Sequence, residues 1–258
     1  MSHDSVLLER HGAVARVTLN RPDVLNSFDD AMFAQFLAAF DQIKRDRSFR
    51  AVHLTGAGRA FCAGQDISGQ LPSGDHGSHL ERHWNPAARA IRHLEIPVVA
   101  AVNGVAAGAG ANLALACDFV IAADEASFIQ AFINIGLVPD TGGTWSLPHL
   151  VGHARAAAVL MLGEKIGAKQ AADWGMIYRA VPLASLDAEA GALTAKLASM
   201  PTLALGLTKR LLNAAATASF DRQLAVEAEM QTIAGKSRDH LEGVAAFKEK
   251  RKPVFEGR

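Results

Sequence analysis

The sequence contains little that would suit an oxidising compartment, a membrane or a nucleic acid. Its 258 residues include two cysteines, Cys62 and Cys117, which form no CxxC pair and no metal-like spacing, so a reduced cytoplasmic setting fits best. The 26 basic and 26 acidic residues cancel, so no overall field attracts the chain to nucleic acid or to a membrane surface. The longest apolar runs, such as residues 104–111, are too short to span a bilayer, and residues 1–5 do not resemble a signal peptide. We therefore expect a cytoplasmic protein with no nucleic-acid or membrane partner.

Several motifs of common enzyme classes are missing as well. The sequence has no GxxxxGK[ST] phosphate loop and no GxSxG nucleophile elbow. Residues 108–113 begin like a dinucleotide-binding fingerprint, but Leu113 stands where the third glycine would be. His76, His79 and His83 have no carboxylate pattern that would complete a metal site, and we interpret them as polar residues of a loop and of the exposed start of a helix. We expect no metal.

The spacing of apolar residues predicts an α/β fold. Short apolar runs predict strands, and apolar residues spaced three to four apart predict helices. The predicted strands cover residues 6–8, 13–19, 51–55, 97–102, 119–122 and 177–181, and the helices among them cover residues 28–45, 79–94, 109–117, 144–150, 153–162 and 168–174. Residues 68–78, rich in Gly, Ser, Asp and Pro, are interpreted as a mobile loop. The recurring strand–strand–helix order indicates a spiral rather than a doubly wound sheet.

The last part of the chain has a different pattern. From residue 186 onward it predicts helices without intervening strands, at residues 186–199, 202–215, 220–234 and 238–248. We therefore divide the chain into an α/β region over residues 1–195 and a helical region over residues 196–258. The charged run over residues 248–252 is interpreted as the solvated end of the last helix.

Two glycine-punctuated segments each follow a predicted strand and precede a predicted helix. The first junction covers residues 59–66 (RAFCAGQD), and the second junction covers residues 103–110 (NGVAAGAG). Small residues at such places let backbone N–H groups approach a ligand closely and point at it from a helix N-terminus. Two junctions of this kind can donate converging hydrogen bonds to one oxygen, which gains most from them when it becomes an anion. The pair therefore predicts an oxyanion hole.

A third segment, residues 136–145 (GLVPDTGGTW), carries one ionisable residue. Asp140 lies in a loop between apolar residues, just before a glycine pair that opens a helix. One interpretation is that Asp140 caps this helix, a role that aspartate often has. The other is that its carboxylate serves the chemistry at the two junctions.

Taken together, these segments resemble the enoyl-CoA hydratase/isomerase (crotonase) superfamily over nearly the whole chain. The similarity rests on residues 19–22 (LNRP), 61–66 (FCAGQD), 101–104 (AVNG) and 242–251 (EGVAAFKEKR). Within the superfamily the chain is most similar to the ring-1,2-epoxyphenylacetyl-CoA isomerases of phenylacetate catabolism, through residues 25–28, 62–66, 104–111, 139–145 and 174–177. The resemblance implies a crotonase-type spiral for residues 1–195 and a helical trimerisation region for residues 196–258.

The resemblance also implies how an acyl-CoA substrate binds. The backbone N–H groups of Ala63 and Ala109 would hold the thioester oxygen. Lys250 matches a lysine that reaches the coenzyme of a neighbouring subunit, because family members are commonly trimers or dimers of trimers. No separate cofactor is implied, since coenzyme A is part of the substrate. Its binding strip would be Ala63, Gly64, Gln65, Asp66 and Ile67.

The departures from the family pattern bear on the reaction. True hydratases of this family carry two glutamates, and Asn112 and Phe132 stand at those positions. Adding water across a double bond needs one group that activates water and another that handles the α-proton, and neither residue can take a proton. Asp140 remains as the ionisable candidate. Phe132 would make the site apolar, which should raise the pKa of Asp140 above its ordinary value.

This pattern favours a cofactor-free isomerase in which Asp140 is the acid and base. The resemblance implies conversion of ring-1,2-epoxyphenylacetyl-CoA to the seven-membered oxepin thioester. The alternatives are a Δ3-Δ2-enoyl-CoA isomerase or hydratase-like enzyme, a 4-chlorobenzoyl-CoA-type dehalogenase with Asp140 as nucleophile, and a non-catalytic acyl-CoA-binding subunit. Phe132 weakens the dehalogenase alternative, because an indole N–H normally assists at that position and phenylalanine has none.

Overall fold

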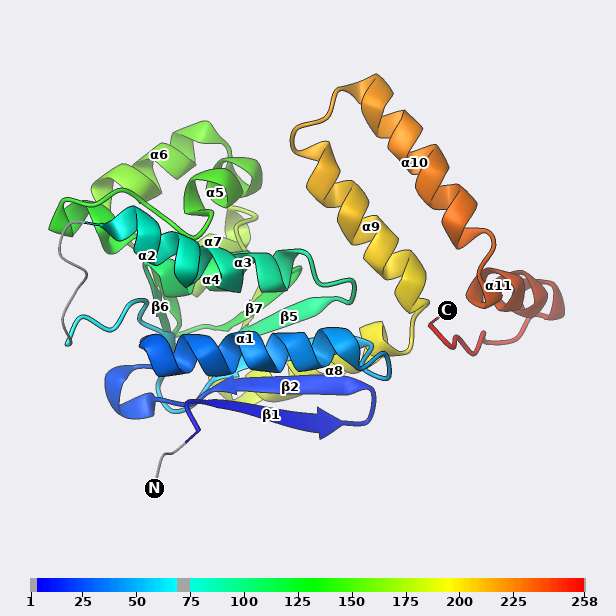
Figure 1. Cartoon of the computed structure of the whole chain (residues 1–258), viewed down its shortest axis with the longest axis horizontal. Helices are drawn as coiled ribbons and strands as arrows, with labels where there is room; N and C mark the ends of the chain where they lie inside the picture. Colours follow the sequence, from blue (N-terminus) through cyan, green and yellow to red (C-terminus); the bar gives the residue numbers. More distant parts are fainter. Residues whose placement is uncertain (1–3, 69–74, 258) are drawn as a thin grey trace.

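The larger of two sheets forms the centre of the protein. The computed structural model describes residues 4–68 and 75–257 (Figure 1). Six strands lie in the order β1-β2-β3-β5-β7-β10, with β1 and β2 antiparallel and the neighbours from β2 to β10 parallel. Their bounds are β1 Val6–His11, β2 Val14–Leu19, β3 Ala51–Gly56, β5 Val98–Val102, β7 Phe119–Ala123 and β10 Arg179–Val181.

A second sheet has four short strands in the order β4-β6-β8-β9. The sequence did not predict them, because three residues are too few to show the alternation that marks a strand. Strands β4, β6 and β8 follow β3, β5 and β7 of the large sheet. Strands β4 and β6 belong to the two junctions, which therefore lie in this second sheet. The strands are β4 Ala60–Cys62, β6 Val105–Ala107, β8 Ser127–Ile129 and β9 Lys165–Gly167.

Successive turns of the chain repeat one pattern, which confirms the predicted spiral. The strand pairs β3/β4, β5/β6 and β7/β8 each give one strand to each sheet, and helical segments follow each pair. The helical segments of the α/β region are η1 Pro22–Val24, α1 Asp30–Arg45, α2 His76–Arg82, α3 Trp84–Arg92, α4 Ala109–Leu115, η2 Ala131–Ile135, α5 Gly143–Val151, α6 His153–Leu162, α7 Ala168–Asp173 and α8 Leu183–Ala198.

The region over residues 68–94 differs from its prediction. The helix expected over residues 79–94 is two helices, α2 and α3, which meet at His83, where φ is −126° and ψ is −74°. Backbone angles outside the helical range interrupt the helix there. Helix α2 already begins at His76, inside the segment interpreted as a loop, and residues 69–74 of that segment lie outside the described residues.

The core lies between the large sheet and its helices. All residues of β3 and β5 are buried, as expected for parallel strands covered on both faces. The carboxylate of Asp29 accepts a hydrogen bond from Met32 N and caps α1. Phe28, which precedes α1, and Trp84 of α3 are both fully buried and pack with ring centroids 5.0 Å apart.

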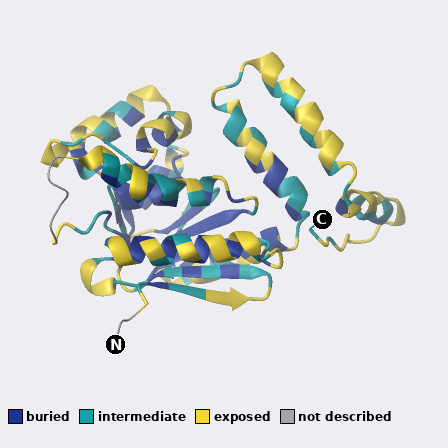
Figure 2. Cartoon of the chain, viewed as in Figure 1, coloured by how far each residue is buried: buried dark blue, intermediate teal, exposed yellow. Residues whose placement is uncertain are grey.

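The helices of the C-terminal region are α9 Thr202–Ala215, α10 Phe220–Ala234 and α11 Arg238–Glu249. Of these, α10 and α11 extend away from the two sheets (Figure 1). Helix α8, which packs on β3, β5 and β7, runs past the predicted boundary at residue 195 to Ala198. Helix α10 contains no buried residue, and α10 and α11 are largely exposed (Figure 2). Their exposed apolar residues include Phe220 and Phe247. Among the described residues, no helix is both long and apolar enough to cross a membrane.

Candidate active site

The first junction is held in place by a segment from earlier in the chain. Gly64 cannot easily be replaced by another residue, because its φ is +92° and a Cβ there would come within 2.9 Å of the Ala107 carbonyl oxygen. Phe28 N donates to the Gly64 carbonyl at 2.8 Å. Asp66 N donates to the Phe28 carbonyl at 2.9 Å. These bonds fix the peptides on both sides of Gln65.

The hydrogen bonds of this junction correct one predicted oxyanion donor. The N–H of Ala63 donates to the Leu25 carbonyl at 3.0 Å, so it is not free to hold a thioester oxygen. By contrast, the backbone N–H of Gln65 has no hydrogen-bond partner among the described residues. Gln65, the residue that follows the positive-φ glycine, therefore offers the free donor. The sequence contains Gly64 as a signal, but it does not show that Leu25 occupies the N–H of Ala63.

The second junction brings another free donor beside the first. Gly108 precedes α4 with φ +53°, and Ala109 is the first residue of the helix. The N–H of Ala109 has no partner in the described part of the chain, as is usual at the first position of a helix. A Cβ built on Gly64 would lie 3.6 Å from Ala109 N, so the two junctions are close together. A Cβ on Gly110 would lie 2.4 Å from the Cys62 carbonyl oxygen, so the two backbones pack directly on each other.

The third segment contacts α4 through Asn112. The Asp140 carbonyl oxygen accepts hydrogen bonds from Gly143 N at 2.9 Å and from Asn112 Nδ2 at 2.8 Å. The Thr141 hydroxyl donates to Asp140 Oδ1 at 2.7 Å. Gly142 precedes α5, which has no side-chain cap, so the interpretation of Asp140 as a helix cap is wrong. Helix α4 thus contacts both the oxyanion junctions and the Asp140 turn.

The environment of Asp140 raises its pKa. Burial of the carboxyl group raises the pKa to about 6, and hydrogen bonds from the Thr141 hydroxyl and its own backbone oppose this shift. The direction agrees with the prediction from the sequence. Phe132 is buried, and its ring lies 3.5 Å from the position of a Cβ on Gly108, beside the start of α4. At neutral pH the carboxylate is ionised, yet it is a stronger base than an exposed aspartate.

The side chain of Gln65 joins the first junction to α2 and α3. Its Oε1 accepts hydrogen bonds from Trp84 Nε1 at 3.0 Å and from His79 Nε2 at 2.9 Å, and its Nε2 donates to the Phe28 carbonyl at 3.1 Å. His79 is buried rather than exposed, as we had interpreted it, and its second ring nitrogen lies 3.1 Å from His83 Nδ1. These histidines therefore support Gln65.

The predicted coenzyme strip continues from Gln65 along the surface. The Asp66 carboxylate accepts hydrogen bonds from Ser68 and pairs with Arg21 at 2.9 Å, and these contacts hold its pKa below its usual range. Ile67 is 70% exposed. Lys250 ends α11 with φ +54°, and α11 lies far from α4 in Figure 1. Lys250 is thus remote from the junctions of its own chain.

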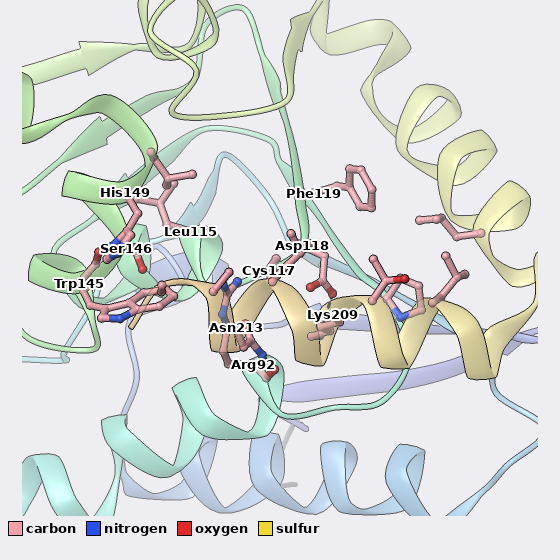
Figure 3. Close-up of a pocket in the computed structure, with 18 residues that line it drawn as sticks. Arg92, Leu115, Cys117, Asp118, Phe119, Trp145, Ser146, His149, Lys209 and Asn213 are labelled. Carbon is pink, nitrogen blue, oxygen red and sulfur yellow. Dashed lines mark hydrogen bonds and ion pairs between the residues drawn. The ribbon is translucent and has the colours of Figure 1, made fainter. Parts of the chain in front are cut away.

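A separate cavity of about 530 Å³ lies between α9 and the α/β region (Figure 3). Within it, Lys209 of α9 pairs with Asp118 at 2.7 Å and ties the helix to the start of β7. Trp145 and Ser146 of α5 form one wall, but Asp140 and the donors Gln65 and Ala109 are not among the described residues that line it. The cavity is therefore distinct from the site built around α4.

Comparisons with known proteins show which family the chain is similar to. Residues 9–258 match the sequence model of the enoyl-CoA hydratase/isomerase family. A 1,2-epoxyphenylacetyl-CoA isomerase from Escherichia coli (strain K12) is 48% identical over 250 residues, which cover 95% of each chain. A probable enoyl-CoA hydratase from Rhodobacter capsulatus is 45% identical, with 100% of both chains covered. A solved structure of a putative enoyl-CoA hydratase/isomerase from Mycobacterium abscessus aligns with a TM-score of 0.93 at 37% identity, over 98% of this chain and 100% of that one.

Proposed function

The chain belongs to the enoyl-CoA hydratase/isomerase family, and on this basis we propose that it is an isomerase that moves a proton within an acyl-CoA thioester. Asp140 is the acid and base, and the backbone N–H groups of Gln65 and Ala109 bind the thioester oxygen. The coenzyme portion lies along residues 63–67. No further cofactor takes part, because the reaction is neither a redox step nor a group transfer.

In the proposed reaction Asp140 first removes a proton from the carbon next to the thioester carbonyl. The electron pair of that C–H bond moves into the carbonyl, whose oxygen becomes an anion held by the two N–H groups. The electrons then return, and the Asp140 carboxylic acid delivers the same proton to another carbon of the acyl group. Substrate and product have the same composition.

The observation that carries this proposal is the contrast between the two carboxylates of the three segments. Asp66 is paired with Arg21, and its pKa is below its usual range, so it is a weak base. Asp140 has a pKa near 6 and lies on the turn that α4 contacts. A base with a pKa near the working pH is the more effective one.

For the acyl group, we propose ring-1,2-epoxyphenylacetyl-CoA, which the site would convert to the oxepin thioester. The carbon–carbon bond shared by the epoxide and the six-membered ring breaks as the ring double bonds shift, and Asp140 moves the α-proton to a ring carbon, so no atom is gained or lost. The 48% identity to the Escherichia coli enzyme supports this choice. A Δ3-to-Δ2 shift of a double bond needs the same proton transfer and is a second activity of the proposed site. A dehalogenase lacks support because Phe132 has no N–H, and a non-catalytic subunit would not need the raised pKa of Asp140.

Hydration provides the test against the hydratase alternative, a function found in the names of several relatives. Because Asn112 and Phe132 replace both glutamates, we expect hydration of crotonyl-CoA to be slower than isomerisation of ring-1,2-epoxyphenylacetyl-CoA by at least about 10²-fold. Both rates are measured on one preparation at one pH. Asn112→Glu alone should not create a good hydratase, since the second group is still absent. Hydration as fast as in a dedicated hydratase would contradict the proposal.

We also propose that α9–α11 pack against other subunits in a trimer or a dimer of trimers. Helix α10 has no buried residue, and Phe220 and Phe247 are 76% and 85% exposed. Such large exposed apolar side chains on adjacent helices are typical of an interface. Subunit packing would also bring Lys250 to the coenzyme of a neighbour.

Replacing Lys250 with alanine should therefore weaken substrate binding. We expect KM to rise by about 2–5-fold with a smaller change in kcat, because a lysine–phosphate contact at the surface contributes modestly to binding. Steady-state kinetics of Lys250→Ala and of the neighbouring control Lys248→Ala check this, with the oligomeric state confirmed by light scattering. An unchanged KM in an intact oligomer would leave residues 248–252 as a solvated helix end.

A further inference from the structure

Two buried amide side chains form a chain of hydrogen bonds that ends on the Asp140 turn. Gln130 Nε2 donates to Asn112 Oδ1 at 2.7 Å, and Asn112 Nδ2 donates to the Asp140 carbonyl oxygen at 2.8 Å. Gln130 is 0% exposed and Asn112 is 1% exposed. Water therefore does not compete for these bonds, and each amide depends on the other for its orientation.

The chemistry of the acceptor fixes the direction of this chain. The Asp140 carbonyl oxygen can only accept, so the Asn112 atom that faces it must be Nδ2. Asn112 Oδ1 then points to Gln130, whose Nε2 must be the donor. The opposite orientation of both amides would place two oxygens against each other at Asp140. The Asp140 carbonyl thus sets the orientation of the Asn112 amide, and Gln130 supports it by donating to Asn112 Oδ1.

The turn that receives this bond is strained. Thr141 has φ +51°, in the left-handed region that β-branched residues rarely adopt, and Gly142 follows with φ +81°. Such a conformation persists only when its surroundings enforce it. Asn112 is part of those surroundings, since a Cβ on Gly143 would lie 2.4 Å from Asn112 Nδ2. The Asn112 side chain both contacts the start of α5 and bonds the carbonyl of Asp140.

From these contacts we propose that Asn112 is a positioning residue, which holds the strained Asp140 turn against α4, the helix that also carries the oxyanion donor Ala109. Gln130 acts through Asn112 by fixing its amide. This assignment rests on the proposed acid–base role of Asp140. It gives a second meaning to the residue that replaces a hydratase glutamate: an ionised glutamate has no proton to donate to the Asp140 carbonyl. The presence of asparagine instead of glutamate at position 112 would then have two effects: it removes a carboxylate that hydration needs, and it supplies the N–H that supports the Asp140 turn.

The test measures exchange of the α-protons of phenylacetyl-CoA in deuterated water by NMR, at saturating and limiting concentrations. The variants are Asn112→Leu, Gln130→Met and the double variant. The control is Asn213→Leu. Asn213 lies on α9, and its side chain donates a hydrogen bond to the Arg92 carbonyl oxygen at 3.1 Å. Circular dichroism and the oligomeric state show which variants fold.

We expect Asn112→Leu to lower the exchange rate at saturation by about 10–10²-fold, because a small misplacement of a reacting group is costly, with little change in half-saturation. Gln130→Met should lower it by about 3–10-fold, and the double variant should match Asn112→Leu, because Gln130 acts only through Asn112. Asn213→Leu should stay near the wild-type rate.

Three results would overturn the assignment: a near-normal rate in folded Asn112→Leu, strictly additive losses in the double variant, or a larger half-saturation with an unchanged maximal rate. If Asn112→Leu does not fold, a normal rate in Gln130→Met is enough to overturn it. If Asp140→Asn itself keeps wild-type exchange, the proposed function fails instead. The two failures are thereby distinguished.

Discussion

Replacing Asp140 with asparagine is expected to lower turnover of ring-1,2-epoxyphenylacetyl-CoA by about 10²–10⁴-fold, the range that general acid–base groups contribute. The substitution keeps the shape of the side chain and an oxygen that can accept the bond from the Thr141 hydroxyl. It removes only the base. Binding of the coenzyme strip should therefore survive, and kcat should fall while KM changes little.

Asp124→Asn is the matched control, because Asp124 is an exposed aspartate after β7. It should retain wild-type kinetics. Comparable turnover in Asp140→Asn and Asp124→Asn would show that Asp140 is not the base. Loss of binding without loss of kcat would show that it acts on the substrate ground state.

The Asp140→Asn variant should be more stable than the wild type at alkaline pH. The folded protein raises the pKa of Asp140 from 3.8 to about 6, so the fold favours the protonated carboxyl. Its stabilising contribution is present below pH 3.8 and is lost as the pH rises through about 6. At pH 8 Asp140→Asn should gain up to about 3 kcal/mol in the free energy of unfolding, and near pH 4 the difference should shrink. Urea denaturation at both pH values measures this, and equal stability at pH 8 would contradict the raised pKa.

Replacing Ala109 with proline should abolish one oxyanion donor without breaking α4. Ala109 is the first residue of the helix, where proline is well tolerated because the N–H has no intrahelical partner. Gly108 has φ +53° and ψ −127°, a conformation that glycine can keep when it precedes the introduced proline. Removing one donor from an oxyanion hole costs about 10²–10³ in kcat, and we expect a loss of that size here.

Ala109→Gly keeps the N–H and is the control for this prediction. It should lower kcat far less than Ala109→Pro, with both variants folded by circular dichroism. If the two variants lose activity equally, the loss comes from packing at α4 rather than from the donor. Full activity in folded Ala109→Pro would remove Ala109 from the hole.

Much of this site could be predicted from the sequence, because glycine spacing records local backbone demands. The two junctions, Ala109 and Asp140 lie in short continuous segments, and the positive φ of Gly64 and Gly108 agrees with the residues found there. The spiral followed from the repeated strand–strand–helix order. The three-residue strands of the small sheet could not be predicted, since they carry too few residues to show a period.

The contacts that the sequence did not reveal connect distant segments. Leu25 takes the N–H of Ala63, and this transfers the free donor to Gln65. His79 is buried because it bonds Gln65, although its polar neighbourhood in the sequence indicated an exposed residue. Asn112 was predicted from the family pattern only as a missing carboxylate. Its bonds to Gln130 and Asp140 exist because three separate segments meet at α4.

The central claim is that Asp140 moves a proton next to a thioester held by Gln65 and Ala109, and α-proton exchange tests it most directly. Phenylacetyl-CoA is incubated with the enzyme in deuterated water, and loss of the α-proton signal is followed by NMR over a range of pH values. The account predicts exchange that increases through a midpoint near 6, the pKa of Asp140, and that is absent in Asp140→Asn. No exchange by the wild type, or equal exchange by Asp140→Asn, would contradict it.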